Sequence, residues 1–173
     1  MILEAVSVGS LEVNCYILAA GKKSPAIIID PGDQEHKIRR VLAKYELEPA
    51  FIINTHGHYD HIGCDDKFNV PVYIHRLDEA LLREPQKNLS AAFSISYSVR
   101  SPIKTVEEKD NIVLGEIKLE VIHIPGHTPG GMCLLMKSPQ GQILFSGDAL
   151  FCRGIGRSDL AGGNEAILIK GIK

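Results

Sequence analysis

The sequence predicts an α/β fold in which mixed sheets are layered with helices. In the first half of the chain, apolar segments typical of strands are interleaved with a segment of helical periodicity. The second half instead contains two stretches with the pattern of β-hairpins. With 173 residues, the chain is long enough to bury a substantial core, and we expect one domain spanning residues 1–173.

The elements of the first half follow from local patterns, taken from the N-terminus onward. Apolar alternation over Met1–Leu18 and the apolar run Ala26–Asp30 predict strands, with a Gly-Lys-Lys-Ser-Pro turn before the second. Between Glu35 and Tyr45 apolar residues recur at helical spacing, and Phe51–Asn54 then has the character of a buried strand. Strand, helix and strand in this order indicate a βαβ unit with a right-handed crossover.

The remaining elements are shorter. We expect a short helix from His61 to Phe68, a strand at Val72–Ile74, a helix at Leu77–Arg83, hairpins at Asn111–Ile124 and Met132–Ser146, and a C-terminal helix after a cap at Asn164. The hairpins should turn at Gly115-Glu116 and at Ser138-Pro139-Gln140-Gly141. Residues 84–104 have the least regular pattern. The polar loops fall at strand ends, where α/β folds usually carry function.

Composition narrows the classes of function. The net charge of -2 gives no electrostatic reason to expect a nucleic acid partner. The N-terminus lacks the basic start and continuous apolar run of a signal peptide, and no stretch approaches bilayer-spanning length, so we expect a cytoplasmic protein with no membrane partner. Cys15, Cys64, Cys133 and Cys152 form no CxxC pair, which favours reduced and mostly buried thiols.

Four potential metal ligands fall within six residues of the segment THGHYDH, directly after a predicted strand: His56, His58, Asp60 and His61. In extended backbone, residues two apart point the same way, so His56 and His58 can reach one ion. A helix that begins near Asp60 can turn Asp60 and His61 toward a second ion. Packing does not account for this concentration, because buried polar groups without a common partner are costly.

Two later residues complete the candidate site. His127 lies in Pro-Gly-His-Thr-Pro-Gly, a loop whose glycines and prolines constrain the backbone, and Asp148 lies in Ser-Gly-Asp after a predicted strand. Each is a weak signal alone, since an aspartate in such a place is more often a turn residue. His36, His75 and His123 stand alone in the sequence, and solvated, capping or packing roles are favoured for them.

Taken together, these segments resemble the metallo-β-lactamase superfamily and, within it, the glyoxalase II-like hydrolases. The matching segments are Ile29-Asp30-Pro31-Gly32, THGHYDHIG, HIPGHTPGG and FSGDALFCRGIGRSDLAGG, in family order. The resemblance implies a four-layer αββα sandwich with mixed sheets. It assigns His56, His58 and His127 to a first metal ion, Asp60 and His61 to a second, and Asp148 to both as a bridge. Asp60 and Asp148 are accordingly the candidate catalytic residues, and Asp30 is expected to orient a ligand histidine.

The sequence departs from the family pattern toward its C-terminus. The family continues to another strand and a loop with a last histidine for the second metal, whereas this sequence stops at Lys173, which implies a shortened chain without those last elements. A weakened second site and self-association through uncovered apolar surface are expected from this. Arg157 falls where glyoxalase II has a basic residue for the glutathione carboxylate and is the substrate-binding candidate, but Asp159 falls where that enzyme has a tyrosine. Cys152, close to Asp148, is expected to be a packing residue.

The predicted function is hydrolysis of a small-molecule thioester or related ester by hydroxide generated on a metal ion. Zinc is the expected metal, with two ions in the family pattern, and iron or manganese are alternatives. A second hypothesis is a persulfide dioxygenase-like enzyme, in which one iron is held by His56, His127 and Asp148. A third is a metal-binding domain without turnover. Metal analysis, oxygen uptake and thioester assays discriminate among the three.

Overall fold

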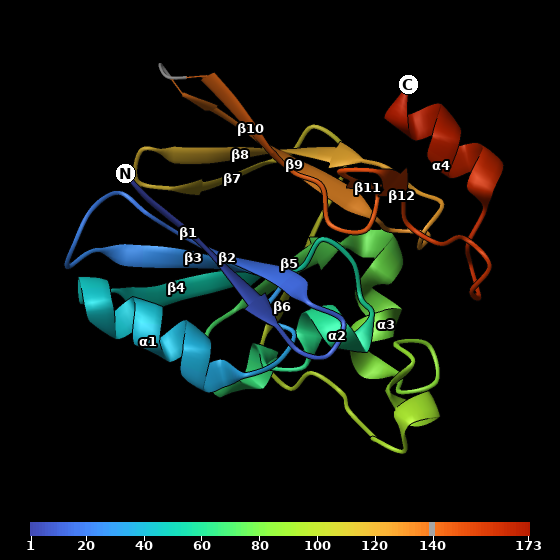
Figure 1. The fold of residues 1–173 in the computed structure, drawn as a ribbon, viewed down its shortest axis with the longest axis horizontal. Helices are drawn as coiled ribbons and strands as arrows, with labels where there is room; N and C mark the ends of the chain where they lie inside the picture. The colour runs from blue at the N-terminus through green and yellow to red at the C-terminus, as the bar shows by residue number, and fades with distance from the viewer. Residues whose placement is uncertain (139–140) are drawn as a thin grey trace.

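The computed structural model describes residues 1–138 and 141–173, which form two stacked sheets and a small ribbon (Figure 1). The first sheet has the order β1-β2-β3-β4-β5-β6, with β1 (Ile2–Val8), β2 (Val13–Ala19), β3 (Pro25–Ile29), β4 (Glu48–Ile53), β5 (Val72–His75) and β6 (Ile103–Val106). Its first three strands are antiparallel and β3 to β6 are parallel, so this sheet is mixed.

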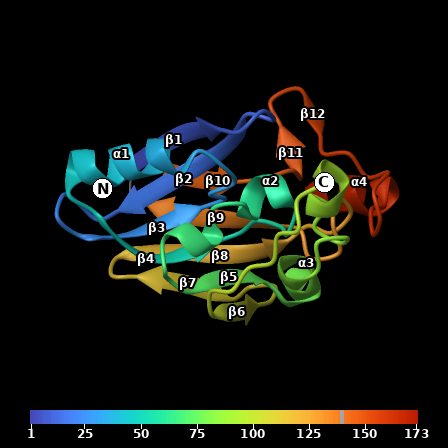
Figure 2. The same ribbon diagram turned by 90° about the horizontal axis from the view of Figure 1, so that it is seen from below.

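The second sheet is antiparallel, with the order β10-β9-β8-β7. Its strands are β7 (Asn111–Leu114), β8 (Ile117–His123), β9 (Met132–Ser138) and β10 (Gly141–Phe145), and the ribbon pairs β11 (Leu150–Phe151) with β12 (Gly154–Ile155). Helices α1 (Glu35–Tyr45), α2 (Tyr59–Ile62) and α3 (Glu79–Arg83) lie on the outer side of the first sheet, as Figure 2 shows from below. Short 3₁₀ turns cover Asp65–Lys67, Arg76–Asp78 and Ser90–Phe93.

Strand β3 shows why the sequence of a strand in the first sheet is continuously apolar. Ile28 packs with the buried face of α1, whereas Ile27 and Ile29 belong to the core between the two sheets. All three side chains are fully buried. Because successive strand residues point to opposite faces, a sheet covered on both sides needs apolar residues at every position.

Helix α4 (Glu165–Ile172) forms the fourth layer, at one end of the outer face of the second sheet (Figure 1). Asn164 caps it by accepting a hydrogen bond from Ile167 N at 3.1 Å. Leu168 is fully buried against a small cluster that includes Ile124 and Cys133, a burial that stabilises the helix by about 1.5–3 kcal/mol. The layers therefore run helix, sheet, sheet, helix, which is the predicted αββα order.

Helix α4 also touches the loop that follows β8. Asn164 N donates to Gly126 O at 2.8 Å, and a Cβ atom at Gly126 would lie 2.5 Å from Leu168 N. Gly126 has a φ of +127°, which side chains rarely tolerate. The loop thus comes into backbone contact with α4 only because residue 126 is glycine.

Several elements differ from the sequence-based expectation. The helix expected from His61 to Phe68 is instead α2 followed by a 3₁₀ turn, and β4 begins at Glu48 rather than Phe51. Strands β6, β11 and β12 were not predicted. The second hairpin is present as β9 and β10, but its central residues Pro139 and Gln140 lie outside the described residues. Among the helices in the described part of the chain, none has the length and apolar character needed to cross a bilayer.

Candidate metal centre

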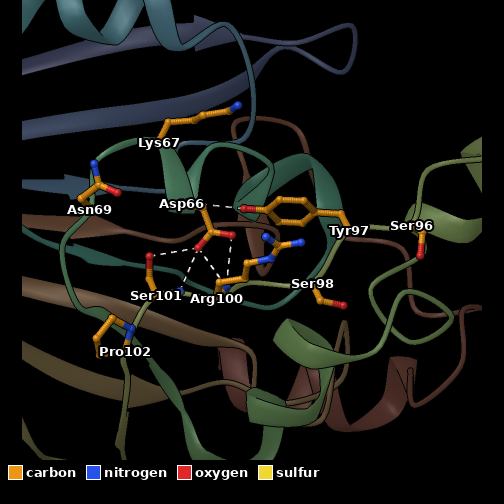
Figure 3. Close-up of a pocket in the computed structure, with 9 residues that line it drawn as sticks. All are labelled: Asp66, Lys67, Asn69, Ser96, Tyr97, Ser98, Arg100, Ser101 and Pro102. Carbon is orange, nitrogen blue, oxygen red and sulfur yellow. Dashed lines mark hydrogen bonds between the residues drawn. The ribbon is translucent and has the colours of Figure 1, made fainter.

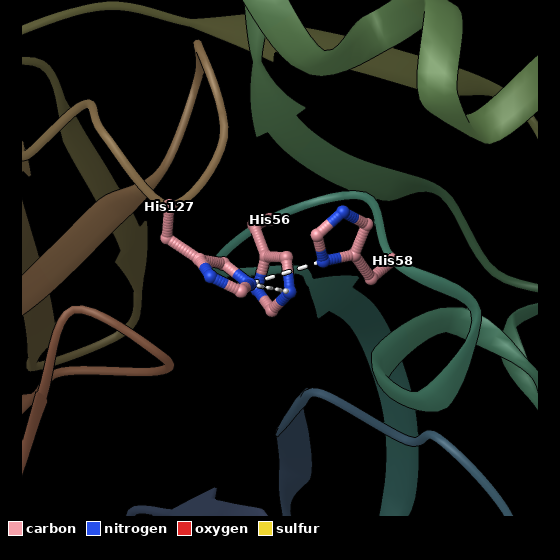
Figure 4. Close-up of side chains that lie close together, drawn as sticks. All are labelled: His56, His58 and His127. Atoms are coloured by element: carbon pink, nitrogen blue, oxygen red, sulfur yellow. Dashed lines mark hydrogen bonds between the residues drawn. The ribbon is translucent and has the colours of Figure 1, made fainter. Parts of the chain in front are cut away.

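Three histidines from two distant segments lie close together (Figure 4). His56 and His58 follow β4, and His127 lies in the loop between β8 and β9. His127 Nε2 lies 3.0 Å from His58 Nδ1 and 3.2 Å from His56 Nε2. The two segments are joined directly, because Met132 N at the start of β9 donates to Thr55 O at 2.9 Å. All three imidazoles are buried.

The contacts of the outer nitrogens of two of these rings indicate where each ring carries a hydrogen. His127 Nδ1 lies 2.7 Å from Arg157 O, and since a carbonyl only accepts, Nδ1 carries the hydrogen. His56 Nδ1 lies 3.4 Å from the hydroxyl of Thr55, which itself donates to Asp30 Oδ2 at 2.7 Å. In the neutral form with the hydrogen on Nδ1, Nε2 of His56 and of His127 directs a lone pair toward the other ring. Two such lone pairs 3.2 Å apart call for a cation between them, so the donor set fits a metal ion.

Burial keeps two of these imidazoles neutral. Desolvation, reinforced by the neighbouring histidines, lowers the pKa of His56 well below its usual value and lowers the pKa of His58 to about 3. Both rings are therefore unprotonated at neutral pH without any metal. A metal ion would therefore not have to compete with the additional proton of an imidazolium before binding.

A second group of possible ligands surrounds His61. Its Nε2 lies 3.3 Å from Asp148 Oδ1 and 3.7 Å from Asp60 Oδ2, and its Nδ1 lies 3.1 Å from Asp30 Oδ2. Asp148 faces both groups, since its other oxygen lies 3.5 Å from His127 Nε2. Within residues 1–138 and 141–173, neither nitrogen of His61 has a partner in hydrogen-bonding geometry, despite these short distances.

The charges around His61 favour a positive group at this position. Burial alone would lower the pKa of His61, but Asp30, Asp148 and Asp60 outweigh it and raise that pKa well above its usual value. For the carboxyl group of Asp148, burial alone would raise the pKa, but His61 and His127 hold that pKa below its usual value. Three carboxylates around one imidazole are suited to a cation, whether it is a metal ion or a protonated ring.

Two glycines allow the ligand loops to approach one another. A Cβ atom at Gly147 would lie 2.3 Å from Thr55 Oγ1, and Gly147 has a φ of +48°. A Cβ atom at Gly32 would lie 1.4 Å from Asp60 O. Thr55, for which no role was predicted from the sequence, thus supports His56 and sets the approach of the Asp148 loop. A hydroxyl residue placed between a buried strand and the first histidine was the available signal.

An open cleft of about 720 Å³ adjoins the Asp60, His61 and Asp148 side of the site, and Leu11, Leu150, Phe151 and Arg157 are among its lining residues. The Arg157 guanidinium donates two hydrogen bonds of 2.8 Å to Asp159, so its charge is already paired within the chain. A second hollow of similar volume, around Asp66 and Tyr97, contains none of the clustered histidines (Figure 3).

The remaining histidines and the four cysteines differ in how far they are buried in the fold. His36 is exposed on α1, and His75 stacks on His123 with ring centroids 4.0 Å apart, away from the three clustered histidines. Cys15, Cys64 and Cys133 are buried, but Cys152 is exposed. The expectation that Cys152 is a packing residue is wrong, because it lies in the surface turn between the two-residue strands β11 and β12, which offers no core to pack against.

Comparisons with known proteins bear on the identity of this site. The sequence profile described as the Metallo-beta-lactamase superfamily matches residues 8–172. The chain is 37% identical over 177 residues to an uncharacterised protein of Aquifex aeolicus (strain VF5), covering 100% of this chain and 82% of that protein. It is 34% identical over 170 residues to the probable metallo-hydrolase YqgX of Bacillus subtilis (strain 168), covering 95% and 79%. It is 28% identical over 179 residues to the hydroxyacylglutathione hydrolase GloC of Haemophilus influenzae, covering 100% and 83%.

Solved structures show the same fold. BLEG-1, a B3 metallo-beta-lactamase, superposes with a TM-score of 0.87 at 31% identity, covering 99% of this chain and 83% of that one. TTHA1623 in a di-iron-bound form gives 0.80 at 31% identity, covering 98% and 83%. ETHE1 from Myxococcus xanthus gives 0.75 at 22% identity, covering 99% and 68%, which shows likeness of fold alone. The predicted family and the layered α/β fold are confirmed: the chain belongs to the metallo-β-lactamase superfamily, whose members are mostly metal-dependent hydrolases.

Proposed function

We propose that this chain hydrolyses a small-molecule thioester or related ester, using metal ions held by the clustered histidines and Asp148. The observation that carries the proposal is the convergence of His56 Nε2, His58 Nδ1 and His127 Nε2, with Asp148 Oδ2 3.5 Å from His127 Nε2. Its relatives include a probable metallo-hydrolase and a hydroxyacylglutathione hydrolase, which supports this class of reaction.

Zinc is the proposed first ion, because imidazole nitrogens and carboxylate oxygens are the ligands of catalytic zinc sites. Iron and manganese are alternatives, and one structural relative is a di-iron form. Asp60, His61 and Asp148 would hold the second ion, with Asp148 between the two. When bound, such ions activate water and polarise the carbonyl of a substrate.

The protein's side chains would bind the substrate, and a water molecule would attack its carbonyl group. Leu11, Leu150 and Phe151 are 64%, 40% and 48% exposed along the cleft and offer an apolar wall for an acyl group. Ser146 also lines the cleft, but its hydroxyl donates to Leu150 O at 2.8 Å, a carbonyl that cannot act as the base a nucleophilic serine needs. The attacking oxygen is therefore proposed to come from solvent.

The test begins with protein purified without added metal, whose metal content is measured directly. Zinc-, iron- and manganese-loaded protein is then assayed with acyl-glutathione and acyl-coenzyme A thioesters and with a simple aryl ester. We expect hydrolysis that chelation abolishes and metal restores, that His127→Ala lowers at least 100-fold, and that His36→Ala leaves unchanged. Tight metal binding without any hydrolysis would refute the proposal and leave a binding domain.

The persulfide dioxygenase-like alternative has a specific geometric basis. His56 Nε2 and Asp148 Oδ2 lie 3.2 Å and 3.5 Å from His127 Nε2, and two imidazoles with one carboxylate form the ligand set of mononuclear iron oxygenases. Oxygen uptake by the iron-loaded chain with glutathione persulfide, in the absence of thioester hydrolysis, would favour this alternative over the hydrolase.

A further inference from the structure

Asp78 is a fully buried carboxylate that the site described above does not use. It ends the 3₁₀ turn Arg76–Asp78, after β5, and precedes α3. Read from sequence, it is an ordinary aspartate at the start of a short helix. Its side chain nevertheless makes no capping hydrogen bond to α3. A charged group with no local partner must be satisfied from elsewhere in the fold.

Its partners come from both segments that carry the clustered histidines. Asp78 Oδ2 accepts hydrogen bonds from Gly57 N at 3.1 Å and from Thr128 Oγ1 at 2.7 Å, and Oδ1 accepts one from Gly130 N at 2.6 Å. Gly57 lies between His56 and His58, and Thr128 follows His127. One carboxylate is therefore hydrogen-bonded both to the segment of His56 and His58 and to the segment of His127.

The glycines on either side have no room for a side chain. A Cβ atom at Gly130 would lie 2.6 Å from Asp78 N and 2.7 Å from Asp78 Oδ1. A Cβ atom at Gly57 would lie 2.4 Å from Leu81 Cβ. Gly130 is thus in close contact with Asp78 itself and Gly57 with the helix α3 that follows it, and the separation of the two loops depends on where this segment places the Asp78 carboxylate.

We propose that Asp78 is a positioning residue whose carboxylate fixes the distance between the two histidine-bearing segments and so sets the geometry of the first metal site. The inference rests on the proposed role of these histidines as metal ligands. Hydrogen bonds from backbone N–H and hydroxyl groups to a buried carboxylate are strong and directional, which suits this task. Support of this kind changes metal affinity by about 10- to 100-fold.

Asp66 provides a control with the same kinds of donor, at a half-buried rather than a fully buried position. It accepts hydrogen bonds from Arg100 N, Ser101 N and Ser101 Oγ at 2.9 Å each, again two backbone amides and one hydroxyl (Figure 3). It fastens a loop that carries no candidate ligand. Asp66→Asn and Asp78→Asn therefore remove the same kind of contact at two places in one fold.

The experiment measures zinc affinity of the whole chain by competition with a chromophoric chelator, the visible spectrum of the cobalt-loaded protein, and unfolding in urea. We expect Asp78→Asn to weaken zinc binding 10- to 100-fold and to shift the cobalt spectrum. Asp66→Asn should lower stability with less than a threefold change in zinc affinity and no spectral shift. Thr128→Val should give a smaller loss of affinity that Thr128→Ser restores, a series that remains informative if Asp78→Asn does not fold.

The outcomes separate this inference from the proposed function. Unchanged zinc affinity and cobalt spectrum in Asp78→Asn or in Thr128→Val, or equal losses in Asp66→Asn, would overturn the positioning role even if the wild-type chain hydrolyses thioesters. A wild-type chain that binds zinc at the histidines but hydrolyses nothing would overturn the proposed function and leave the positioning role intact.

Discussion

Replacing Gly147 by alanine should displace the loop that carries Asp148. The added Cβ atom would lie 2.3 Å from Thr55 Oγ1, about 1 Å short of ordinary contact at 3.4 Å. Thr55 cannot yield easily, because it is buried and its hydroxyl and N–H both bond to Asp30 at 2.7 Å. Overpacking costs about 1–3 kcal/mol and the left-handed backbone about 1–2 kcal/mol, so we expect a loss of about 2–5 kcal/mol in unfolding free energy.

The same substitution should reduce catalysis more than stability alone explains. A shift of about 1 Å in a catalytic group costs on the order of 100-fold in rate. The assay combines urea unfolding of the metal-free chain with hydrolysis and zinc titration of the loaded chain. Gly154→Ala is the control, since no atom of the described residues lies within 4 Å of a Cβ atom at Gly154, which lies further along the chain in β12. Equal stability and activity in the two variants would refute the steric argument.

Three further predictions concern single side chains. Asp148→Ala should remove most activity and bound metal whereas His36→Ala should not, and metal analysis of dialysed variants would show it. The pKa of His58 is lowered to about 3 in the folded chain, so its contribution to stability is complete above pH 6.5 and is lost as the pH falls toward 3. Urea unfolding of metal-free protein between pH 7 and 4 should show a decline to which His58 contributes up to about 1.4 kcal/mol per pH unit, and His58→Gln should remove that share. Arg157→Ala should leave zinc affinity unchanged, because only its backbone carbonyl contacts His127, while any effect should appear in KM.

The fold was predictable wherever the local pattern was strong. Helix α1 has the predicted bounds, Glu35–Tyr45, because its amphipathic period is clear. Strand β4 begins earlier than predicted, since Pro49 reads as a strand breaker yet pairs with Ala26, next to a register shift at Ala26/Ile27. Strand β6 is half-exposed and is defined by its pairing with β5, about 30 residues away, which no local pattern reveals.

The candidate site was predictable in its residues but not in its supports. The four close-spaced ligand candidates stand out because chemistry and spacing coincide within THGHYDH. Asp78 gave no such signal, because its three donors lie 21, 50 and 52 residues away. The pairing of Arg157 with Asp159 was likewise hidden, since residues two apart are expected to interact only in particular backbone conformations.

The contact between α4 and Gly126 links metal occupancy to the order of the chain's last helix. The His127 loop and α4 are joined by the hydrogen bond from Asn164 N to Gly126 O and by the close approach of Gly126 to the backbone of Leu168. An interaction that orders the loop therefore also restricts the motion of α4, and the reverse holds as well. Thermodynamic reciprocity then requires that an ion bound at His127 protect α4 against local unfolding by the same free energy by which an ordered α4 tightens the ion. Protease cleavage or hydrogen exchange within residues 165–172 should therefore slow as zinc is added, so that α4 acts as a reporter of loading at a site it does not touch.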